Sequence, residues 1–216
     1  AEAEELIALA KEKGKVVMVD HTYLYTGAVQ KIKSLVDEDI LGNIQYIDST
    51  RINLGLFQAD INVLWDLAPH DISICSHIMK GKPTAVQATG ISHTKNGLEN
   101  IAYLTLRYGD DKIAHFNCSW SSPVKVRHML IGGDKKMIVF NDLEASEKIK
   151  IYDTGYSVQS DEDKEKIMVD YRVGDIHVPK IANKEALGGM ATDLFDAITK
   201  GTTPLSDADL GLEVVA

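Results

Sequence analysis

The sequence predicts a fold of the α/β (α+β) class, with a large, predominantly antiparallel open sheet and helices on one face of it. Helix, strand and helix patterns succeed one another in the first part of the chain, an order typical of α/β folds. From residue 84 onward, short strand patterns follow one another across turn signals such as Lys95-Asn96-Gly97. Consecutive strands joined by short turns pair antiparallel. The sheet is therefore expected to be mostly antiparallel, and the few helices can cover only one of its faces.

Before residue 84 helices and strands alternate. In the opening segment Ala1–Gly14, one apolar stripe at helical spacing (Leu6, Ile7, Leu9 and Ala10) predicts a helix that ends at Gly14. The apolar run Val16–Asp20 is typical of a buried strand. The elements expected next are a helix over 28–36, a long alternating strand over 44–54 and a helix over 63–79.

After residue 84 strands dominate. Alternating or apolar runs predict strands over 85–92, 100–108, 113–121, 127–132, 137–140, 148–152 and 167–173. A polar, acidic loop is expected over 157–166, and a helix over 184–200 that ends at Gly201. Ser206 is expected to cap the start of a last helix.

Some of these strands carry apolar residues at both alternating positions, as in Ile101–Leu106 and Lys112–Cys118. Because the helices can cover only one face of the sheet, burial of the other face is expected to come from a contact between subunits. The sequence therefore predicts a homo-oligomer that forms through the open face of the sheet.

Composition excludes several classes of partner. The 216 residues include 23 Lys and Arg against 32 Asp and Glu, a net charge of −9, whereas nucleic acids and anionic membranes bind basic surfaces. No apolar run approaches the ~20 residues that span a bilayer. Cys75 and Cys118 are expected to be reduced and buried. Because no signal peptide or lipidation motif is visible, the expected compartment is the cytoplasm.

Both ends of the chain interrupt a helical pattern. The first helix has neither an initiator Met nor a cap before it, and the last one stops without a C-cap. The expectation is that the sequence is a fragment of a longer protein.

The densest group of chemically reactive side chains lies in Asn62–His77. Asp66 and His70 are four residues apart, so on a helix they share a face, about 40° apart. A carboxylate beside an imidazole orients the ring and raises its proton affinity, which suits a general acid or base near neutral pH. The alternative is a structural pair that ties the helix to the sheet. Pro69 disfavours helical geometry at the preceding residue, so Asp66 is expected just ahead of the regular helix.

Two further groups are candidates for ligand binding, each with a structural alternative. His21, Tyr23 and Tyr25 follow a buried strand pattern, where ligands gather in α/β folds, although aromatic packing explains them equally well. Arg51 and Asn53 lie on one face of a strand, and an Arg can bind carboxylate or phosphate. The alternative for this pair is an exposed face of the sheet.

No metal site is predicted. Asp66, His70 and His77 have a spacing that suits two ligands but not the third, and no Cys pair supports them. The other histidines are expected to be structural or solvent-exposed: His93, His115, His128 and His177.

Motifs that hold nucleotides or activate a serine are missing from the sequence, namely G-x-G-x-x-G, G-x-x-x-x-G-K-[ST] and G-x-S-x-G. Gly132-Gly133 falls in a predicted hairpin turn and Gly188-Gly189 falls in a predicted helix, so neither pair is placed to bind a pyrophosphate. No cofactor-binding residue is therefore identified in this chain.

Three segments together resemble one family: Val16–Lys33 with Asp20-His-Thr-Tyr-Leu-Tyr, Arg51–Ile72 with Trp65-Asp-Leu-Ala-Pro-His-Asp, and Ser119–Arg127. They are similar to the glucose–fructose oxidoreductase/inositol dehydrogenase (Gfo/Idh/MocA) family, over nearly the whole chain. Members have an N-terminal Rossmann domain that binds NAD(P), and a second domain whose antiparallel sheet carries the substrate site and commonly the oligomer interface. By this resemblance, residues 1–20 are the tail end of a Rossmann domain, its last helix and strand. Residues 21–216 are then the substrate-binding and oligomerisation domain.

The resemblance implies an oxidoreductase that passes a hydride between a sugar or nucleotide sugar and a nicotinamide. His70 would contact the reacting hydroxyl or carbonyl, Asp66 would orient it, and Trp65 of the same motif joins the substrate-binding candidates. The family's G-x-G-x-x-G and its E-K-P motif, whose Lys acts in catalysis, are missing, and Gly27 stands where many members have Pro. NAD or NADP would be bound mainly by a domain outside this chain, and the chain alone is expected to be inactive. The alternative is a non-catalytic sugar-binding or oligomerisation module on the same fold.

Overall fold

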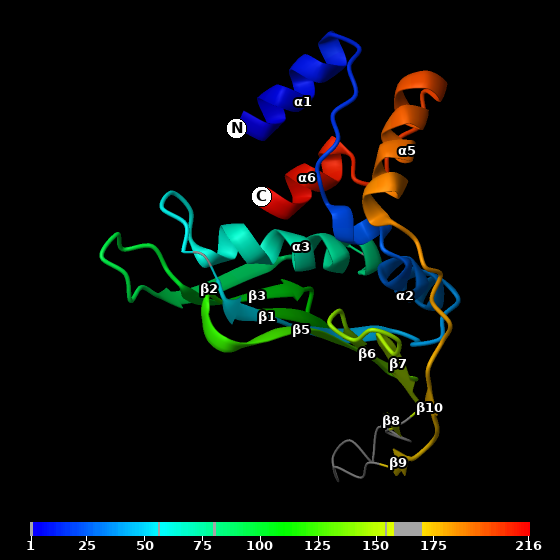
Figure 1. Ribbon diagram of the computed structural model, residues 1–216. Coiled ribbons are helices and arrows are strands. Elements are labelled where there is room, and N and C mark those ends of the chain that lie inside the picture. Colours follow the sequence, from blue (N-terminus) through cyan, green and yellow to red (C-terminus); the bar gives the residue numbers. More distant parts are fainter. Residues whose placement is uncertain (1, 56, 80, 154, 158–169) are drawn as a thin grey trace. The chain divides into compact units, whose positions relative to one another are not determined.

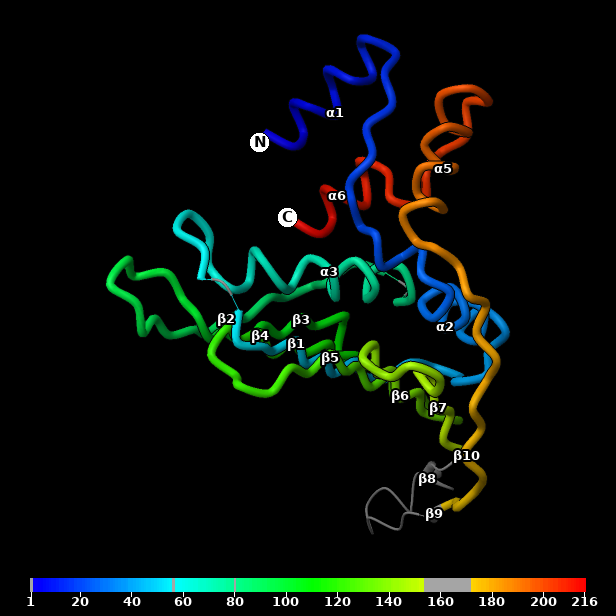
Figure 2. The backbone as a smooth tube through the Cα atoms, in the orientation of Figure 1, coloured from blue at the N-terminus to red at the C-terminus, as the bar shows by residue number. Residues whose placement is uncertain are grey.

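The computed structural model describes residues 2–55, 57–79, 81–153, 155–157 and 170–216 (Figure 1). The chain falls into two compact units, and Figure 2 follows the backbone through each of them. The first unit comprises residues 1–31, 69–80 and 181–216, and the second comprises residues 32–68 and 81–180.

An eight-stranded sheet forms the second unit, with the strand order β10-β7-β6-β5-β1-β4-β3-β2. Its strands are β1 (Ile44–Leu54), β2 (Ala85–Ile91), β3 (Ile101–Tyr108), β4 (Lys112–Ser119), β5 (Ser121–Gly133), β6 (Met137–Asn141), β7 (Ile149–Tyr152) and β10 (Ile176–His177). β1 is parallel to β4, and every other pair of neighbours in this sheet is antiparallel. The predicted large, predominantly antiparallel open sheet is therefore confirmed.

The two faces of this sheet differ in burial. Ile47 on β1 is in register with Ala114 on β4 and Ile131 on β5, and all three side chains are buried. We call the face that they share the core face. The opposite, open face carries Asp48 and His115, whose Oδ1 and Nδ1 atoms lie 3.8 Å apart and which are both partly exposed. The alternation follows the period of two that a strand imposes on its side chains.

Helices form most of the first unit. α1 (Glu2–Glu12) contacts α6 (Ala208–Val215), and α5 (Ala186–Lys200) packs on the 3₁₀ turn η1 (Thr22–Tyr25). α2 (Gly27–Asp37) and α3 (Val63–Ile78) each have residues in both units. Only a glycine fits at the start of α2, because a Cβ on Gly27 would lie 2.0 Å from the carbonyl oxygen of Ala182.

The small residues of helix α5 face the rest of the first unit, whereas its large apolar side chains are exposed. Ala197 is buried, and a Cβ added to Gly189 would make ordinary contact, at 3.6 Å, with the Cβ of Tyr25. The large apolar side chains of the helix are exposed: Leu187, Leu194, Phe195 and Ile198.

Two local predictions are wrong. Val16–Asp20 is not a strand, because within the described residues it forms only an isolated bridge, between Met18 and Asp207, in place of a continuous ladder. Ser206 does not cap the last helix. The Asp207 side chain caps it instead, and Ser206 is buried.

The strand predicted over 167–173 is only partly described. β9 (Asp170–Arg172) pairs with β8 (Gly155–Ser157) in a separate two-stranded sheet. Residues 167–169 lie outside the described residues, as do residues 158–166 of the predicted acidic loop.

Two predictions about the chain's general character can be compared with the structure. Cys75 and Cys118 are both buried, as predicted. Among the described residues, no helix combines the length and the apolar character that a membrane span requires.

Candidate active site

The start of α3 is fixed by a side-chain cap. The backbone N–H of Trp65 donates to Oδ1 of Asn62 (3.2 Å), and Nδ2 of Asn62 donates to Oε2 of Glu99 (3.0 Å). The N–H of Val63 donates to the carbonyl oxygen of Glu99 (2.9 Å). The pKa of the Glu99 carboxyl is lowered by a hydrogen bond from its own backbone and then by the Asn62 amide. The helix therefore begins at a defined point beside the segment that leads into β3.

Asp66 lies in the first turn of α3, and Pro69 lies inside the helix. The expectation that Asp66 precedes the regular helix is therefore wrong. The Asn62 cap starts the helix before Asp66, and Pro69 is accommodated at the cost of one backbone hydrogen bond to the preceding turn.

The carboxylate of Asp66 is held by a buried tryptophan. Nε1 of Trp120 donates to Oδ2 of Asp66 at 2.8 Å, and only 1% of the Trp120 side chain is exposed. Trp120 lies between β4 and β5, where its N–H donates to the carbonyl oxygen of Asn100 and its carbonyl oxygen accepts from the N–H of Gly55. The Phe57 ring packs against it with the ring centroids 5.6 Å apart. These contacts fix the indole, and the indole fixes one oxygen of the carboxylate.

His70 follows Asp66 by one turn of α3, so the two side chains leave the helix on the same face, about 40° apart. The rings of His70 and Tyr23 meet edge to face, with centroids 5.2 Å apart. The hydroxyl of Ser73 donates to the carbonyl oxygen of His70 at 2.7 Å. His70 as a whole is half-buried.

His21 supplies a second imidazole, and His70 lies close enough to it to lower the pKa of His21. His21 is only 5% exposed, and burial lowers its pKa from the ordinary value of 6.5. The charge of His70 lowers it further, whereas the carboxylate of Asp20 opposes this effect. Within the described part of the chain, Nε2 of His21 is a buried polar atom with no hydrogen-bond partner. Burial and the neighbouring imidazole therefore favour a neutral His21.

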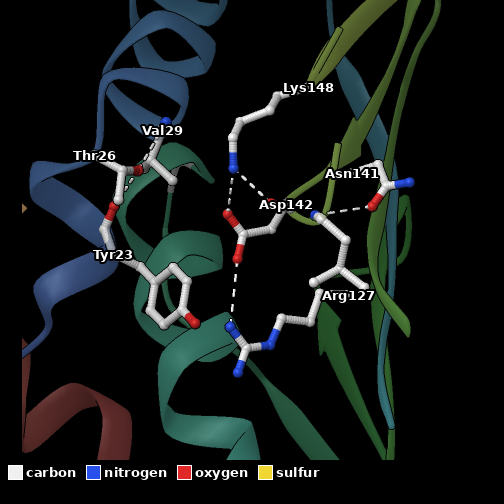
Figure 3. Close-up of polar contacts among 8 residues, drawn as sticks. Tyr23, Thr26, Val29, Arg127, Asn141, Asp142 and Lys148 are labelled. Carbon is white, nitrogen blue, oxygen red and sulfur yellow. Dashed lines mark hydrogen bonds and ion pairs between the residues drawn. The ribbon is translucent and has the colours of Figure 1, made fainter. Parts of the chain in front are cut away.

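Tyr23 stands on a turn that local hydrogen bonds stabilise. The hydroxyl of Thr26 donates to the carbonyl oxygen of Tyr23 (2.7 Å) and accepts from the backbone N–H of Val29 (3.3 Å), as Figure 3 shows. The same hydroxyl therefore joins the end of η1 to the start of α2.

Tyr25 has a different environment from Tyr23. It is buried, and its hydroxyl donates to Oδ2 of Asp193 (2.7 Å) and accepts from the backbone N–H of Ser206 (3.2 Å). Burial raises the pKa of Tyr25 to about 12, and the bond to Asp193 acts in the same direction. The hydroxyl is thus a neutral link between η1, α5 and the segment before α6.

The remaining candidates belong to the second unit. Arg51 is buried on the core face of β1, in register with Cys118 on β4 and Arg127 on β5. Asn53 is half-buried near the end of β1, and Trp65 is 59% exposed on α3.

The structure brings some predicted site residues together and separates others. In the first unit His21, Tyr23 and His70 form one group, whereas the Tyr25 hydroxyl is engaged elsewhere. In the second unit the partner of Asp66 is Trp120, which the sequence pattern did not single out. A tryptophan directly after a strand is a visible signal, but its partner on α3 is set only by the tertiary fold.

The described residues do not gather the ligands of a metal site or the donors of a dinucleotide site. No three of their His, Cys, Asp or Glu side chains lie close enough together to hold a metal ion. The first turn of α5 has its N–H groups occupied, because Glu185 accepts from Leu187 (3.0 Å) and from Gly188. Gly189 donates its N–H to the carbonyl oxygen of Glu185 (3.1 Å), and Gly133 donates its N–H to that of Lys136 (3.0 Å). The N–H groups of Gly188, Gly189 and Gly133 are therefore engaged within the chain and are not offered to a pyrophosphate.

Residues 29–139, just over half of the chain, match the family model of the GFO/IDH/MocA C-terminal domain. The chain belongs to this family. Its match begins in α2 and ends in β6, so it contains β1, α3 with Asp66 and His70, and Trp120. No curated protein is similar enough in sequence to count as a match.

Solved structures share the fold of this GFO/IDH/MocA chain. UDP-N-acetylglucosamine 3-dehydrogenase from Acidithiobacillus ferrooxidans is 20% identical with a TM-score of 0.79, and the match covers 99% of this chain and 64% of that one. Aldose-aldose oxidoreductase from Caulobacter crescentus, complexed with glycerol, is 15% identical (TM-score 0.77, covering 99% and 62%). An inositol dehydrogenase homologue from Azotobacter vinelandii, complexed with NADH and myo-inositol, is 16% identical (TM-score 0.74, covering 99% and 63%). The chain thus spans less than two thirds of the length of each.

Proposed function

We propose that this protein is an NAD(P)-dependent oxidoreductase that acts on the hydroxyl or carbonyl group of a sugar or nucleotide sugar in the cytoplasm. In this proposal residues 21–216 are its substrate-binding and oligomerisation domain, and residues 1–20 are the end of a nucleotide-binding domain. Membership of the GFO/IDH/MocA family supports it. The names of the three structurally similar proteins also support it. One is a dehydrogenase of a nucleotide sugar, one is an aldose-aldose oxidoreductase, and the third is an inositol dehydrogenase homologue complexed with NADH and myo-inositol.

The observation that carries the proposal is the environment of His70. The ring is half-buried, meets Tyr23 edge to face, and lies near enough to the buried imidazole of His21 to lower the pKa of His21. Because His21 is buried and its pKa is lowered, we assign the proton transfer to His70, the half-buried imidazole of the pair. Histidine is the side chain that most often serves in general acid and base catalysis.

His70 is proposed to exchange a proton with the reacting oxygen of the sugar. When the hydroxyl is oxidised, an imidazole nitrogen of His70 takes its proton, and in the reverse direction the same nitrogen returns it to the carbonyl oxygen. Asp66 orients the imidazole, and Trp120 holds Asp66. A nicotinamide supplies the hydride chemistry in this reaction class. Because the described residues do not fit a dinucleotide, we propose that it is held outside this chain.

The other sequence candidates are proposed to bind the substrate. His21 and Tyr23 stand beside His70, Arg51 and Asn53 lie on β1, and Trp65 is exposed on α3. Within the first unit, the Tyr23 ring beside the imidazoles of His70 and His21 combines an aromatic face with polar groups, which suits the C–H and hydroxyl surfaces of a sugar. The contribution of Tyr25 is proposed to be indirect, since its hydroxyl holds η1 in place.

Single-turnover hydride transfer in the intact protein that carries this chain tests the proposal. We expect His70→Ala to lower the rate by about 10²–10⁴-fold, the usual cost of losing a general acid or base, with little change in melting temperature. Asp66→Asn should cost the same or less, because it leaves the imidazole present with a poorer orienting partner. His177→Ala is the matched control, since His177 is exposed on the edge strand β10 and should keep the wild-type rate.

Two outcomes would contradict the proposal. A His70→Ala protein that melts lower but transfers hydride at the wild-type rate would leave His70 with a structural role only. An intact protein that binds sugars but transfers no hydride would support a non-catalytic sugar-binding module instead.

A further inference from the structure

We propose that Gly55 is a positioning residue for the reaction, because it leaves the space in which the Trp120 indole holds the carboxylate of Asp66. The inference rests on the proposed function, in which Asp66 orients His70. Gly55 acts through Trp120 and not by contact with the sugar.

The backbone of Trp120 is held from both sides. Its N–H donates to the carbonyl oxygen of Asn100, which precedes β3 (2.9 Å), and its carbonyl oxygen accepts from the N–H of Gly55, which follows β1 (3.1 Å). Trp120 therefore cannot shift as a whole without loss of a backbone hydrogen bond, which is costly in a buried place. The indole can move only by rotation about its own side-chain bonds.

The space around the indole restricts this rotation. Only 1% of Trp120 is exposed, and the Phe57 ring packs against the indole at a centroid distance of 5.6 Å. A Cβ added to Gly55 would lie 3.0 Å from Cδ1 of Trp120 and 3.5 Å from its Cγ. Carbon atoms attract each other best at ~3.5–4.0 Å, so a methyl group at position 55 would push the indole away.

The atom that this methyl group would push is bonded to the hydrogen-bond donor. In an indole, Cδ1 is the ring carbon next to Nε1, and Nε1 of Trp120 donates to Oδ2 of Asp66 at 2.8 Å. A displacement of Cδ1 therefore moves the donor as well. Asp66 cannot simply follow, because the Asn62 cap fixes the start of the helix that carries it. An alanine at position 55 would thus lengthen or tilt the hydrogen bond.

The direction of the Asp66 carboxylate matters for its role in the proposed reaction. A hydrogen bond from an N–H to a carboxylate is among the stronger ones, and here it fixes one of the two oxygens. A group that orients a catalytic side chain has to be held close to its productive geometry, and misplacement by about 1 Å can lower a rate about 100-fold. We therefore expect Gly55→Ala to misplace Asp66 and, through it, the imidazole of His70.

Hydrogen exchange of the Trp120 indole N–H tests the first step in the intact protein. Trp120→Phe identifies its NMR signal by the loss of that signal. In the wild type the N–H should exchange slowly, because it is buried and bonded. Gly55→Ala should speed this exchange about 10–100-fold, the worth of a hydrogen bond to a charged group. The control is Gly189→Ala, whose Cβ would make an ordinary contact at 3.6 Å, and it should leave the exchange unchanged.

Steady-state hydride transfer tests the second step. Gly55→Ala should lower kcat about 10–100-fold and leave the KM for the sugar little changed, since the disturbed interaction acts on the reacting group. Trp120→Phe should lower kcat by a similar factor. When both changes are combined, Gly55→Ala should add little, because the donor through which it acts is already gone. Gly189→Ala should keep the wild-type kcat.

One other contact of position 55 has to be separated from this effect. The same Cβ would lie 3.0 Å from Nδ2 of Asn53, which is proposed to bind the substrate. Asn53→Ala should raise the KM for the sugar and leave the exchange of the Trp120 indole at its wild-type rate. A Gly55→Ala protein that behaves like Asn53→Ala in both respects would overturn the inference.

Unchanged exchange of the Trp120 N–H in Gly55→Ala would also overturn it, as would a wild-type kcat in a variant that only melts lower. Independent, additive effects of Gly55→Ala and Trp120→Phe on kcat would do the same. If Gly55→Ala does not fold, its combination with Phe57→Leu carries the same test, because loss of the neighbouring ring lets the indole move aside. A wild-type protein that transfers no hydride would contradict the proposed function instead, and the exchange rates would still show whether Gly55 keeps the indole in place.

Discussion

His21 is a buried imidazole that the folded chain keeps neutral. Burial is the main reason that its pKa is lowered, the charge of His70 adds to this effect, and Asp20 opposes it. In the unfolded chain the same side chain takes up a proton near its ordinary pKa of 6.5. Below that pH the unfolded state therefore binds more protons than the folded state, and the free energy of unfolding falls as the pH falls.

We predict that His21→Gln weakens this pH dependence. The free energy of unfolding of the wild type should decrease between pH 8 and pH 5.5, and the variant should lose less over the same interval. Urea unfolding at the two pH values measures both slopes. The other titrating groups are common to both proteins, so the difference between the slopes isolates position 21. Identical slopes would show that His21 is protonated in the folded chain as readily as in the unfolded one.

At the scale of elements, the hydroxyl of Tyr25 joins three segments of the first unit. It bonds Asp193 on α5 and the N–H of Ser206 before α6, while Tyr25 itself ends η1. We predict that Tyr25→Phe lowers the free energy of unfolding by about 1–3 kcal/mol, because it leaves buried polar partners with fewer hydrogen bonds. For a chain of this length that corresponds to about 2–4 °C of melting temperature per kcal/mol.

Tyr46→Phe is a matched control for that change. Within the described residues, the Tyr46 hydroxyl donates to the sulfur of Met137, and a thioether sulfur is a weak acceptor. Thermal melts of both variants measure the difference. The KM for the sugar should stay near its wild-type value in Tyr25→Phe. A raised KM with unchanged stability would instead make Tyr25 a direct substrate contact.

The sequence predicts an element correctly where the pattern is local, and it fails where a residue distant in the chain determines whether the element forms. The long strand predicted over 44–54 has the observed bounds of β1, because alternation over many residues is a strong local pattern. The apolar run Val16–Asp20 has the composition of a strand but only one bridge to a partner, and a strand exists only through its ladder. At the last helix Ser206 and Asp207 are both good caps, and the burial of Ser206 against Tyr25 leaves the role to Asp207.

In the candidate site, too, local features are predictable from the sequence and contacts with distant segments are not. The placement of Asp66 and His70 on one face of a helix follows from their spacing alone. The indole that holds Asp66 and the imidazole that neighbours His70 come from segments distant in the chain. The opposition of Arg51 and Arg127 depends on the register between β1 and β5, which the pattern within either strand alone does not determine.

For the whole molecule, the open face of the sheet is proposed to form the subunit contact. Tyr103 and Ile113 are exposed apolar side chains on this face, with the Tyr103 ring stacked on His115. We predict that Ile113→Glu shifts the protein toward a monomer, because it buries a charge at the contact. Val173→Glu is the control, since Val173 is exposed outside the eight-stranded sheet. Light scattering at high micromolar concentration measures the mass of the particles in solution. A mass of 23.8 kDa for the wild-type 216-residue chain, which is the mass of one monomer, would contradict the prediction.

The last prediction concerns the cofactor and the 216-residue chain by itself. A dinucleotide needs backbone N–H groups for its pyrophosphate, usually at the start of a helix. In this chain the start of α5 is capped by the carboxylate of Glu185, the glycines of β5 pack against Tyr46 and Leu41, and the net charge of −9 repels an anion. Calorimetric titration with NADH should therefore show no binding in the micromolar range, while a cooperative thermal melt confirms that the same sample is folded. Micromolar binding would place the cofactor site within residues 1–216 and would require a different division between the nucleotide-binding and substrate-binding parts of the protein.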